Sequence, residues 1–463
     1  MRALYCRVKR KEARARTLCA NEATIARMRT SPLVVLLCAA ALSFEASAAV
    51  GQGLSPDERR LIAAVAADQP AALALLERVV NINSGTMNLP GVRQVGEIFR
   101  AELVALGFEV EWIDGTPFGR AGHLVARRRG GGPTLLLIGH LDTVFEPASP
   151  FQRFERLSDT EARGPGIIDM KGGDVIIVSA LKSLAAAGVL EGANITVVMT
   201  GDEEDIGSPQ ALARRDLQEA ARDADVVLAF ENGSGDPARA VVARRGHTEW
   251  TLEVTATPAH SSQIFTGEVG AGAILEASRV LTGFYQRLAD QAPLTFSPGV
   301  IVGGTEITFD GPQSRGTAFG KSNVVPERAV AVGDLRAVSP EQLEAAKAAM
   351  LDVARASLPH ARSALTFVDG YPPMATTAGN QQLLAMYDRV SRDLGTGPVE
   401  ATDPRDAGAA DVSFTAGLVD MALDGIGLMG DDSHTATETA DLRTLLTQTQ
   451  RAAVLMHRLL RPN

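Results

Sequence analysis

The first half of the chain alternates between amphipathic stretches, with apolar residues three and four positions apart, and short apolar runs. The amphipathic stretches predict helices. The continuous apolar runs predict strands buried on both faces of a mostly parallel sheet. The predicted helices cover residues 55–80, 92–106, 174–187 and 208–221, and the predicted strands cover residues 108–112, 123–126, 134–138, 195–199 and 226–230. This order predicts an α/β domain.

The pattern changes near residue 245. Strands are predicted at residues 248–255, 295–302, 329–335 and 364–368, and helices at residues 271–289 and 340–356. This β, α, β, β, α, β order predicts a separate antiparallel sheet with two helices on one face, a ferredoxin-like α+β unit. From residue 381 the first pattern resumes. We therefore expect an α/β domain in two parts, residues 49–244 and 371–463, interrupted by residues 245–370.

The N-terminus carries the features of a secretory signal. Residues 33–43 form an apolar run too short to span a bilayer, preceded by Arg27 and Arg29 and followed by small residues. This predicts a signal over residues 1–48 that is removed on export, and a periplasmic or secreted protein. The basic stretch ahead of it is long, so either translation starts at Met28 or the signal has an unusually long basic region. N-terminal sequencing of the precursor distinguishes the two.

Composition excludes several classes of function. The formal net charge is −10, and removing the arginine-rich signal leaves a still more acidic chain, which is unsuited to binding nucleic acid. All three cysteines precede residue 49, so the mature protein is expected to have neither disulfides nor thiol chemistry. No later run approaches the roughly 18 apolar residues of a membrane helix.

Polar residues follow three of the predicted buried strands. His140, the pair Glu203-Glu204, and Glu231 each stand where such a strand ends. In open α/β sheets, ligands bind beyond the carboxyl ends of the strands. We therefore expect these side chains to converge.

Histidine nitrogen and carboxylate oxygen are zinc ligands. The candidate ligands are His140, Asp169, Glu204, Glu231 and His434. Two histidines and three carboxylates are too many for one tetrahedral ion, but they suit two ions about 3.5–4 Å apart that share a carboxylate. The sequence therefore predicts two Zn²⁺ per chain, although Co²⁺ or Mn²⁺ would also fit such ligands.

Two further acids lie next to these candidates. Asp142 is placed to accept the proton on the second ring nitrogen of His140 and so to fix the orientation of that ligand. Glu203 is left free of the metals, and it could take a proton from the attacking water and deliver it to a leaving amine.

These stretches carry a resemblance. Residues 139–143, 166–172, 201–204, 230–231 and 434–438 are similar, in order, to the motifs of the di-zinc aminoacylase and carboxypeptidase family of metallopeptidases, with the glutamate-carboxypeptidase branch closest. The resemblance implies a zinc-binding α/β domain interrupted by a lid or dimerisation domain. It also implies that His140 and Glu231 belong mainly to one metal site and Glu204 and His434 to the other, with Asp169 as the bridge and Glu203 as the base.

The resemblance extends to substrate recognition. It implies that His260 supports the oxyanion, often from the partner subunit of a homodimer, and that Asn323 and Arg336 contact the substrate. Tyr371 and Gly408 are also expected to contact the substrate, but both depart from the family pattern: Tyr371 stands where a second arginine is common, and Gly408 lies in a loop that reads Ala-Gly-Ala-Ala-Asp. The side chain of the released amino acid is therefore not predicted.

The sequence predicts an exported di-zinc peptidase that hydrolyses the amide bond to a C-terminal or N-acylated amino acid. Its substrate would be a small peptide or an N-acyl amino acid. An amidohydrolase of the aminoacylase or deacetylase type, a desuccinylase and a dipeptidase remain alternatives within the family. A binding protein of the cell envelope without catalysis is an alternative from another class, which the presence of Glu203 beside all five candidate ligands disfavours. Metal analysis with one hydrolysis assay separates these classes.

Overall fold

The computed structural model describes residues 53–311 and 313–461. The predicted signal, residues 1–48, lies outside the described residues. Within them, no helix combines the length and the apolar character needed to cross a membrane.

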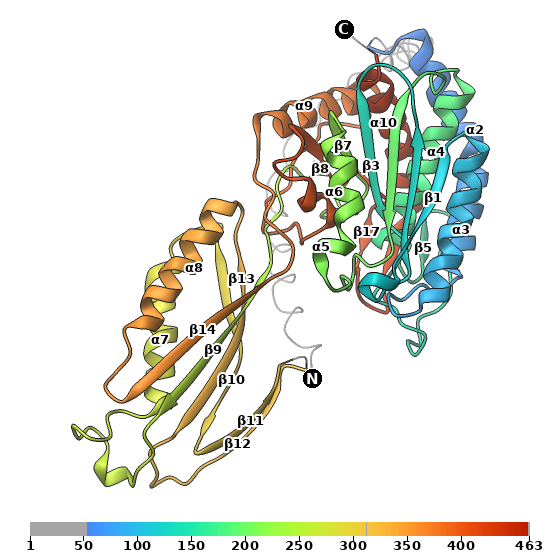
Figure 1. Cartoon of the computed structure of the whole chain (residues 1–463). Coiled ribbons are helices and arrows are strands. Elements are labelled where there is room, and N and C mark those ends of the chain that lie inside the picture. The colour runs from blue at the N-terminus through green and yellow to red at the C-terminus, as the bar shows by residue number, and fades with distance from the viewer. Residues whose placement is uncertain (1–52, 312, 462–463) are drawn as a thin grey trace, which may run out of the picture. The chain divides into compact units, whose positions relative to one another are not determined.

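The α/β domain is built on a six-stranded sheet with the order β1-β2-β6-β3-β7-β16 (Figure 1). Strands β6, β3, β7 and β16 run parallel to one another, whereas β2 pairs antiparallel with both β1 and β6. The prediction of a mostly parallel sheet is thus confirmed. The strands are β1 (Glu109–Asp114), β2 (Gly122–Arg128), β3 (Thr134–His140), β6 (Asn194–Thr200), β7 (Val226–Ala229) and β16 (Met421–Leu423).

Both faces of this sheet are covered. Successive side chains of a strand point to opposite faces, and in β3 Leu135 and Leu137 belong to one core cluster while Leu136 and Ile138 belong to another. The first cluster includes α2 (Pro56–Val80), α3 (Leu89–Ala105), α4 (Gly172–Ala186), α9 (Ala378–Asp393) and α10 (Leu442–Leu459), and the second includes α6 (Arg215–Arg222). The continuous apolar runs are explained by this burial on two sides.

One predicted helix is wrong in its continuity. A single helix was expected over residues 208–221, but the chain forms α5 (Gln210–Ala213) and then α6, with a break at Arg214. The Arg214 side chain is 1% exposed and binds two buried carboxylates, those of Asp202 and Asp411. The helical pattern could not show this, because an arginine in that position is equally compatible with a solvent-facing site.

The inserted unit has the predicted order of elements. Its sheet has the order β10-β13-β9-β14 with every neighbouring pair antiparallel, and α7 and α8 cover one face of it (Figure 1). A hairpin of β11 and β12 was not predicted from the sequence. The elements are β9 (Thr248–Ala256), α7 (Ala273–Leu288), β10 (Thr295–Gly304), β11 (Glu306–Asp310), β12 (Arg315–Phe319), β13 (Arg328–Arg336), α8 (Pro340–Arg355) and β14 (Ala361–Asp369).

Candidate metal centre

The carboxyl ends of three neighbouring parallel strands bring the first candidate residues together. His140 is the last residue of β3, Glu203 and Glu204 follow β6, and Glu231 follows β7. The His140 side chain is 1% exposed, and its Nε2 lies 3.4 Å from Oε1 of Glu231. The convergence expected from the strand ends is therefore present in the structure.

Asp169 lies between the two candidate histidines. Its Oδ1 is 3.1 Å from Nε2 of His140, and its Oδ2 is 3.0 Å from Nε2 of His434. The same His434 nitrogen is 3.2 Å from Oε2 of Glu204. One carboxylate thus presents a separate oxygen to each half of the cluster, which is the arrangement that a carboxylate shared by two cations requires.

The five predicted ligands are therefore gathered in one cluster, and Glu203 is as close to it as they are. The ligand atoms of His140, Asp169 and Glu204 all lie within 4.8 Å of one another, and so do those of His140, Glu203 and Glu231. The second group contains the residue expected to act as the base. The division of roles between ligand and base remains a prediction.

The donor set fits divalent cations. Oε1 of Glu204 is buried and has no hydrogen-bond partner within the described part of the chain. Burial, and then the neighbouring Asp169, raise the pKa of Glu204 to about 7. Burial and Asp169 likewise raise the pKa of Glu231. Buried acids that repel one another in this way are stabilised by bound cations.

The two histidines show the same demand for positive charge. Hydrogen bonds to Asp169 and Glu204 raise the pKa of His434 to about 11. Burial opposes protonation of His140, but Glu231, Asp142 and Asp169 outweigh it and hold its pKa well above the usual value. Without metal, each imidazole binds a proton where a cation would otherwise bind its nitrogen.

Asp142 has a wider role than the sequence predicted. Nδ1 of His140 lies 3.5 Å from Oδ1 of Asp142 and 3.1 Å from its backbone oxygen. The Asp142 carboxylate also accepts the backbone N–H groups of Glu203 and Glu204, at 3.0 and 3.1 Å, and the hydroxyl of Thr86 at 2.6 Å. Asp142 therefore orients the candidate ligand His140 and the acidic pair together.

Glu203 is 9% exposed. Burial, followed by the charges of Glu231, Asp411 and Glu204, raises the pKa of Glu203 well above its ordinary value against the opposing effect of His140. A proton bound to this carboxyl group is therefore held more tightly than on an ordinary glutamate.

Glu438 was part of a recognised motif but had no predicted role. Its carboxylate accepts the backbone N–H groups of Gly166, Ile168 and Asp169, at 3.2, 2.9 and 3.3 Å. These bonds hold the turn before α4 that presents Asp169. The chain reaches this turn because β18 (Thr439–Asp441) pairs with β5 (Glu161–Arg163).

His434 itself has a left-handed backbone, with φ of 64°. This conformation costs a non-glycine residue about 1–2 kcal/mol. Such strain is retained where the surrounding structure or the function requires it.

Of the predicted substrate residues of the inserted unit, His260 and Asn323 lie in neighbouring segments, whereas Arg336 lies at the far end of β13, beyond the pair of Leu335 with Thr248. The backbone N–H of Ser261 donates to the carbonyl of Asn323 at 2.8 Å, and Nδ1 of the adjacent His260 lies 2.9 Å from Oγ of Ser262. Arg336 is paired with Asp334 at 2.8 Å. Their roles toward a substrate stay predictions.

The two positions that depart from the family pattern both make structural contacts. The Tyr371 hydroxyl donates to the backbone carbonyl of Glu203, and burial raises the pKa of this phenol well above its usual value, so it remains a donor. The Gly408 carbonyl accepts Nη1 of Arg244 at 2.6 Å.

Sequence reasoning missed a second buried ion pair. Arg244 donates through Nε to Oδ2 of Asp424 at 2.7 Å, and Oδ1 of Asp424 accepts the backbone N–H of Glu231 at 3.3 Å. The available signal was the position of Asp424 directly after the apolar strand β16.

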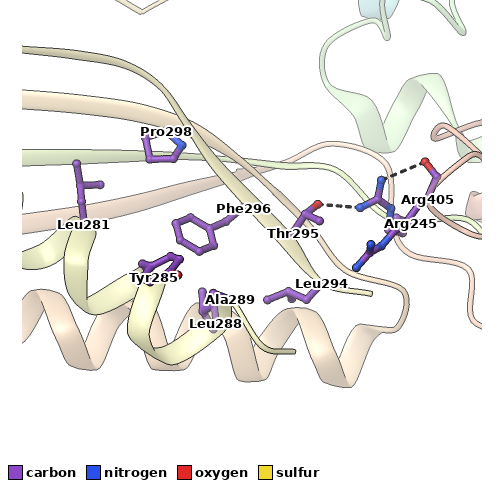
Figure 2. A pocket seen from close by; sticks show the side chains of 10 residues that line it. All are labelled: Arg245, Leu281, Tyr285, Leu288, Ala289, Leu294, Thr295, Phe296, Pro298 and Arg405. Atoms are coloured by element: carbon purple, nitrogen blue, oxygen red, sulfur yellow. Dashed lines mark hydrogen bonds between the residues drawn. The ribbon is translucent and has the colours of Figure 1, made fainter. Parts of the chain in front are cut away.

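A hollow of about 570 Å³ lies along the lid between α7 and β10 (Figure 2). Apolar side chains such as Leu281 and Phe296 line one part of it, and Arg245 and Arg405 line another. Arg245 is held by the hydroxyl of Thr295 at 2.7 Å. None of the predicted metal ligands lines this hollow.

The fold and the acid–histidine cluster define a class of protein. The model of peptidase family M20/M25/M40 matches residues 136–460. The chain belongs to this family and is a metal-dependent hydrolase.

Two relatives show how the similarity is distributed. Carboxypeptidase G2 from Pseudomonas sp. (strain RS-16) is 29% identical over 382 residues, which cover 81% of this chain and 85% of that protein. Succinyl-diaminopimelate desuccinylase from Sphingopyxis alaskensis is 32% identical over 186 residues, which cover 37% of this chain and 46% of that protein.

Solved structures share the fold at low sequence identity. An aminopeptidase from Bacillus cereus superposes with a TM-score of 0.68 at 18% identity, covering 85% of this chain and 99% of its own. A Bacillus subtilis protein described as a dinuclear metal-binding peptidase of the M20 family gives a TM-score of 0.59 at 14% identity, with coverage of 85% and 99%.

Proposed function

We propose that the protein is an exported di-zinc metallopeptidase of the glutamate-carboxypeptidase type. It hydrolyses the amide bond to a C-terminal or N-acylated amino acid in a small peptide or N-acyl amino acid. The observation that carries this proposal is the position of Asp169, whose two oxygens face His140 and His434 separately. The Bacillus subtilis relative described as dinuclear supports the stoichiometry of two ions.

The residues divide the chemistry between them. His140 and Glu231 would hold one ion, Glu204 and His434 the other, and Asp169 would be shared. Bound zinc supplies a Lewis acid for the scissile carbonyl and lowers the pKa of the attacking water.

Glu203 does not bind metal in this proposal. Its carboxyl group accepts the proton of the attacking water and passes it to the leaving amine. Its raised pKa suits both transfers. In the lid, His260 donates to the oxyanion, while Asn323 and Arg336 bind the substrate.

An N-acyl-amino-acid amidohydrolase or a dipeptidase is the alternative. The similarity to the desuccinylase covers 46% of that protein and supports N-acyl amino acids as alternative substrates. A panel of N-acyl amino acids, folate-like pteroyl-glutamates, dipeptides and longer peptides, tested with the zinc-loaded protein, separates the possibilities. Release of C-terminal glutamate from a pteroyl-glutamate supports the carboxypeptidase assignment, and cleavage of N-acyl amino acids alone replaces it with the alternative.

The base is tested by Glu203→Gln, which preserves the shape of the side chain and removes its basicity. We expect kcat to fall by about 10²–10⁴-fold, the usual contribution of a general base, with metal content still near two ions per chain. The matched control is Glu344→Gln on the exposed face of α8, where the carboxylate is 72% exposed and pairs with Lys347.

Two other results would change the assignment. Normal turnover by Glu203→Gln shows that another group is the base. A metal content that falls to one ion or less shows that Glu203 is a ligand. Its carboxylate lies close enough to the donor atoms of His140 and Glu231 for this role.

Export and association are further parts of the proposal. The predicted signal over residues 1–48 supports export, which N-terminal sequencing of the mature protein from a cell-envelope fraction tests; a mature N-terminus near residue 49 is expected. A homodimer is proposed because the lid of a partner could supply His260. Light scattering on the purified mature protein measures this, and a monomeric mass contradicts it.

A further inference from the structure

Glu203 is fixed through its backbone. Its N–H donates to Oδ1 of Asp142 at 3.0 Å, and its carbonyl accepts the Tyr371 hydroxyl. No hydrogen bond reaches the Glu203 carboxylate from residues 53–311 or 313–461. The point from which this side chain extends is therefore set by the bonds to its peptide groups, which also include the Glu204 N–H donating to Oδ2 of Asp142 at 3.1 Å.

Tyr371 is itself firmly placed. Its ring packs against Phe414 with 5.3 Å between ring centroids, and the guanidinium of Arg214 lies 5.4 Å from the centroid of the same Phe414 ring. Its backbone carbonyl accepts the N–H of His247 at 2.9 Å. His247 lies where the chain enters the inserted unit, and Tyr371 lies where the chain leaves it. This bond therefore holds the Tyr371 backbone, while the contact with Phe414 holds the ring.

The turn before Glu203 is braced from the other side. Asp202 is fully buried, and its carboxylate binds Nη1 of Arg214 at 2.5 Å and the N–H of Gly207 at 2.8 Å. The backbone oxygen of Asp202 accepts Nη2 of Arg214 at 3.0 Å. Arg214 therefore holds Asp202 on the N-terminal side of Glu203, and the Tyr371 hydroxyl holds the Glu203 carbonyl on its C-terminal side.

We propose that Tyr371 is a positioning residue, whose hydroxyl fixes the Glu203 carbonyl and thereby aims the Glu203 carboxylate at the reacting atoms. This inference rests on the proposed role of Glu203 as the base. It assigns Tyr371 to the catalytic step, whereas the sequence pattern had suggested a contact with substrate. A general base acts only within hydrogen-bond reach of its proton, and a displacement of about 1 Å can cost about a hundredfold in rate.

The test is Tyr371→Phe, which removes one hydroxyl and keeps the ring against Phe414. The matched control is Tyr387→Phe. Tyr387 is also buried, and its hydroxyl makes one hydrogen bond, to Oε1 of Gln448 at 3.2 Å, between α9 and α10. Both variants lose one phenolic hydrogen bond, but only the first loses a bond to Glu203.

We expect Tyr371→Phe to lower kcat by roughly ten- to a hundredfold, with KM within about twofold of wild type. Metal content should stay at the wild-type value, and the melting temperature should fall no further than in Tyr387→Phe. The control should keep the wild-type kcat. A wild-type kcat in Tyr371→Phe overturns the proposal, and so does a raised KM with unchanged kcat, because that result would mark a substrate contact.

A second measurement separates this inference from the proposed function. If the zinc-loaded wild type cleaves nothing in the substrate panel, the proposed function fails, and hydrogen–deuterium exchange of the segment 200–207 then decides the role of Tyr371. Faster exchange in Tyr371→Phe than in wild type and Tyr387→Phe supports the anchoring of Glu203. Equal exchange in all three proteins overturns it.

Discussion

Replacing Arg214 by methionine would remove the cation that pairs with two buried carboxylates, those of Asp202 and Asp411. Arg214 is 1% exposed, and the Asp202 and Asp411 side chains are 0% and 4% exposed. The guanidinium lies 2.5 Å from Asp202 and 2.7 Å from Asp411. Methionine fills similar space but leaves both acids without their counter-charge.

The expected cost follows from this geometry. Removing one partner of a buried ion pair typically costs about 3–5 kcal/mol, because the remaining charge stays desolvated. Two hydrogen bonds survive the change, from the Thr200 hydroxyl to Asp411 at 2.6 Å and from the Gly207 N–H to Asp202 at 2.8 Å. They keep each acid partly satisfied, so about 3 kcal/mol is the expected loss at neutral pH.

The loss should depend on pH in a defined direction. Burial already raises the pKa of Asp202 above its ordinary value, even with Arg214 beside it. Removing the cation raises that pKa further. A carboxyl group with a raised pKa binds protons more readily in the folded than in the unfolded state, so stability falls as pH rises above the unfolded value of about 3.9. The deficit of Arg214→Met should therefore be larger at pH 8 than at pH 5.

Thermal and urea unfolding, followed by circular dichroism at pH 5 and pH 8, measure both quantities. The matched control is Arg355→Met, which breaks an exposed pair with Asp352 whose side chains are 74% and 61% exposed. Such a pair contributes about 0–1 kcal/mol. Adding Asp202→Asn and Asp411→Asn to Arg214→Met should recover part of the loss. The reasoning is refuted if Arg214→Met is no less stable than the control at pH 8, or if its deficit grows as the pH falls.

Three further changes test other parts of the structure. Because the acids of the metal-free centre raise the pKa values of His140 and His434, and burial raises that of Glu204 to about 7, zinc binding at pH 7 should release protons and tighten as pH rises. Calorimetry in buffers of different ionisation enthalpy measures the release, and no release contradicts this. In Gly173→Ala the new Cβ would lie 2.0 Å from the carbonyl oxygen of Phe230, so we expect about 1–3 kcal/mol of destabilisation, read as a lower melting temperature, and weaker zinc binding. Burial lowers the pKa of Lys171 to about 7, so between pH 7 and 10 the unfolded chain binds one more proton than the folded chain. Wild-type stability should therefore rise with pH over that range. In a series of melting curves, Lys171→Met should not show this rise.

The sequence predicted those parts of the centre that depend on strand ends. Buried parallel strands are recognisable as apolar runs, and their carboxyl ends lie at one edge of the sheet, so His140, Glu203 and Glu231 could be placed together without coordinates. His434 and Asp169 were candidate ligands by residue type, but only the motif resemblance assigned them to particular metal positions. The strands that bring them together, β17 (Gly430–Asp431) and β18, are too short to show a periodicity.

Arg214 could not be placed from the sequence for a different reason. Its neighbours fit a helical pattern, and one of its partners, Asp411, is 197 residues away. A buried arginine and a solvent-facing one have the same local sequence signature. The distinction depends on packing against residues far away in the sequence, which the local pattern of apolar and polar residues does not reveal. Tyr371 is a similar case, since its partner Glu203 is 168 residues distant.

The acids of the centre share a hydrogen-bonding pattern that could not be predicted from the sequence. The backbone N–H of each acid donates to the carboxylate of a second buried acid, which is bonded elsewhere in turn. The pairs are Asp169 with Glu438, Glu203 and Glu204 with Asp142, and Glu231 with Asp424. Each such bond fixes the backbone of a candidate site residue, and each places a further carboxylate close to the cluster. Burial raises the pKa of Glu438 to about 8, a sign of how crowded these acids are. The carboxylates that orient the candidate site residues therefore also add to the negative charge that a bound cation would neutralise at the ends of β3, β6 and β7.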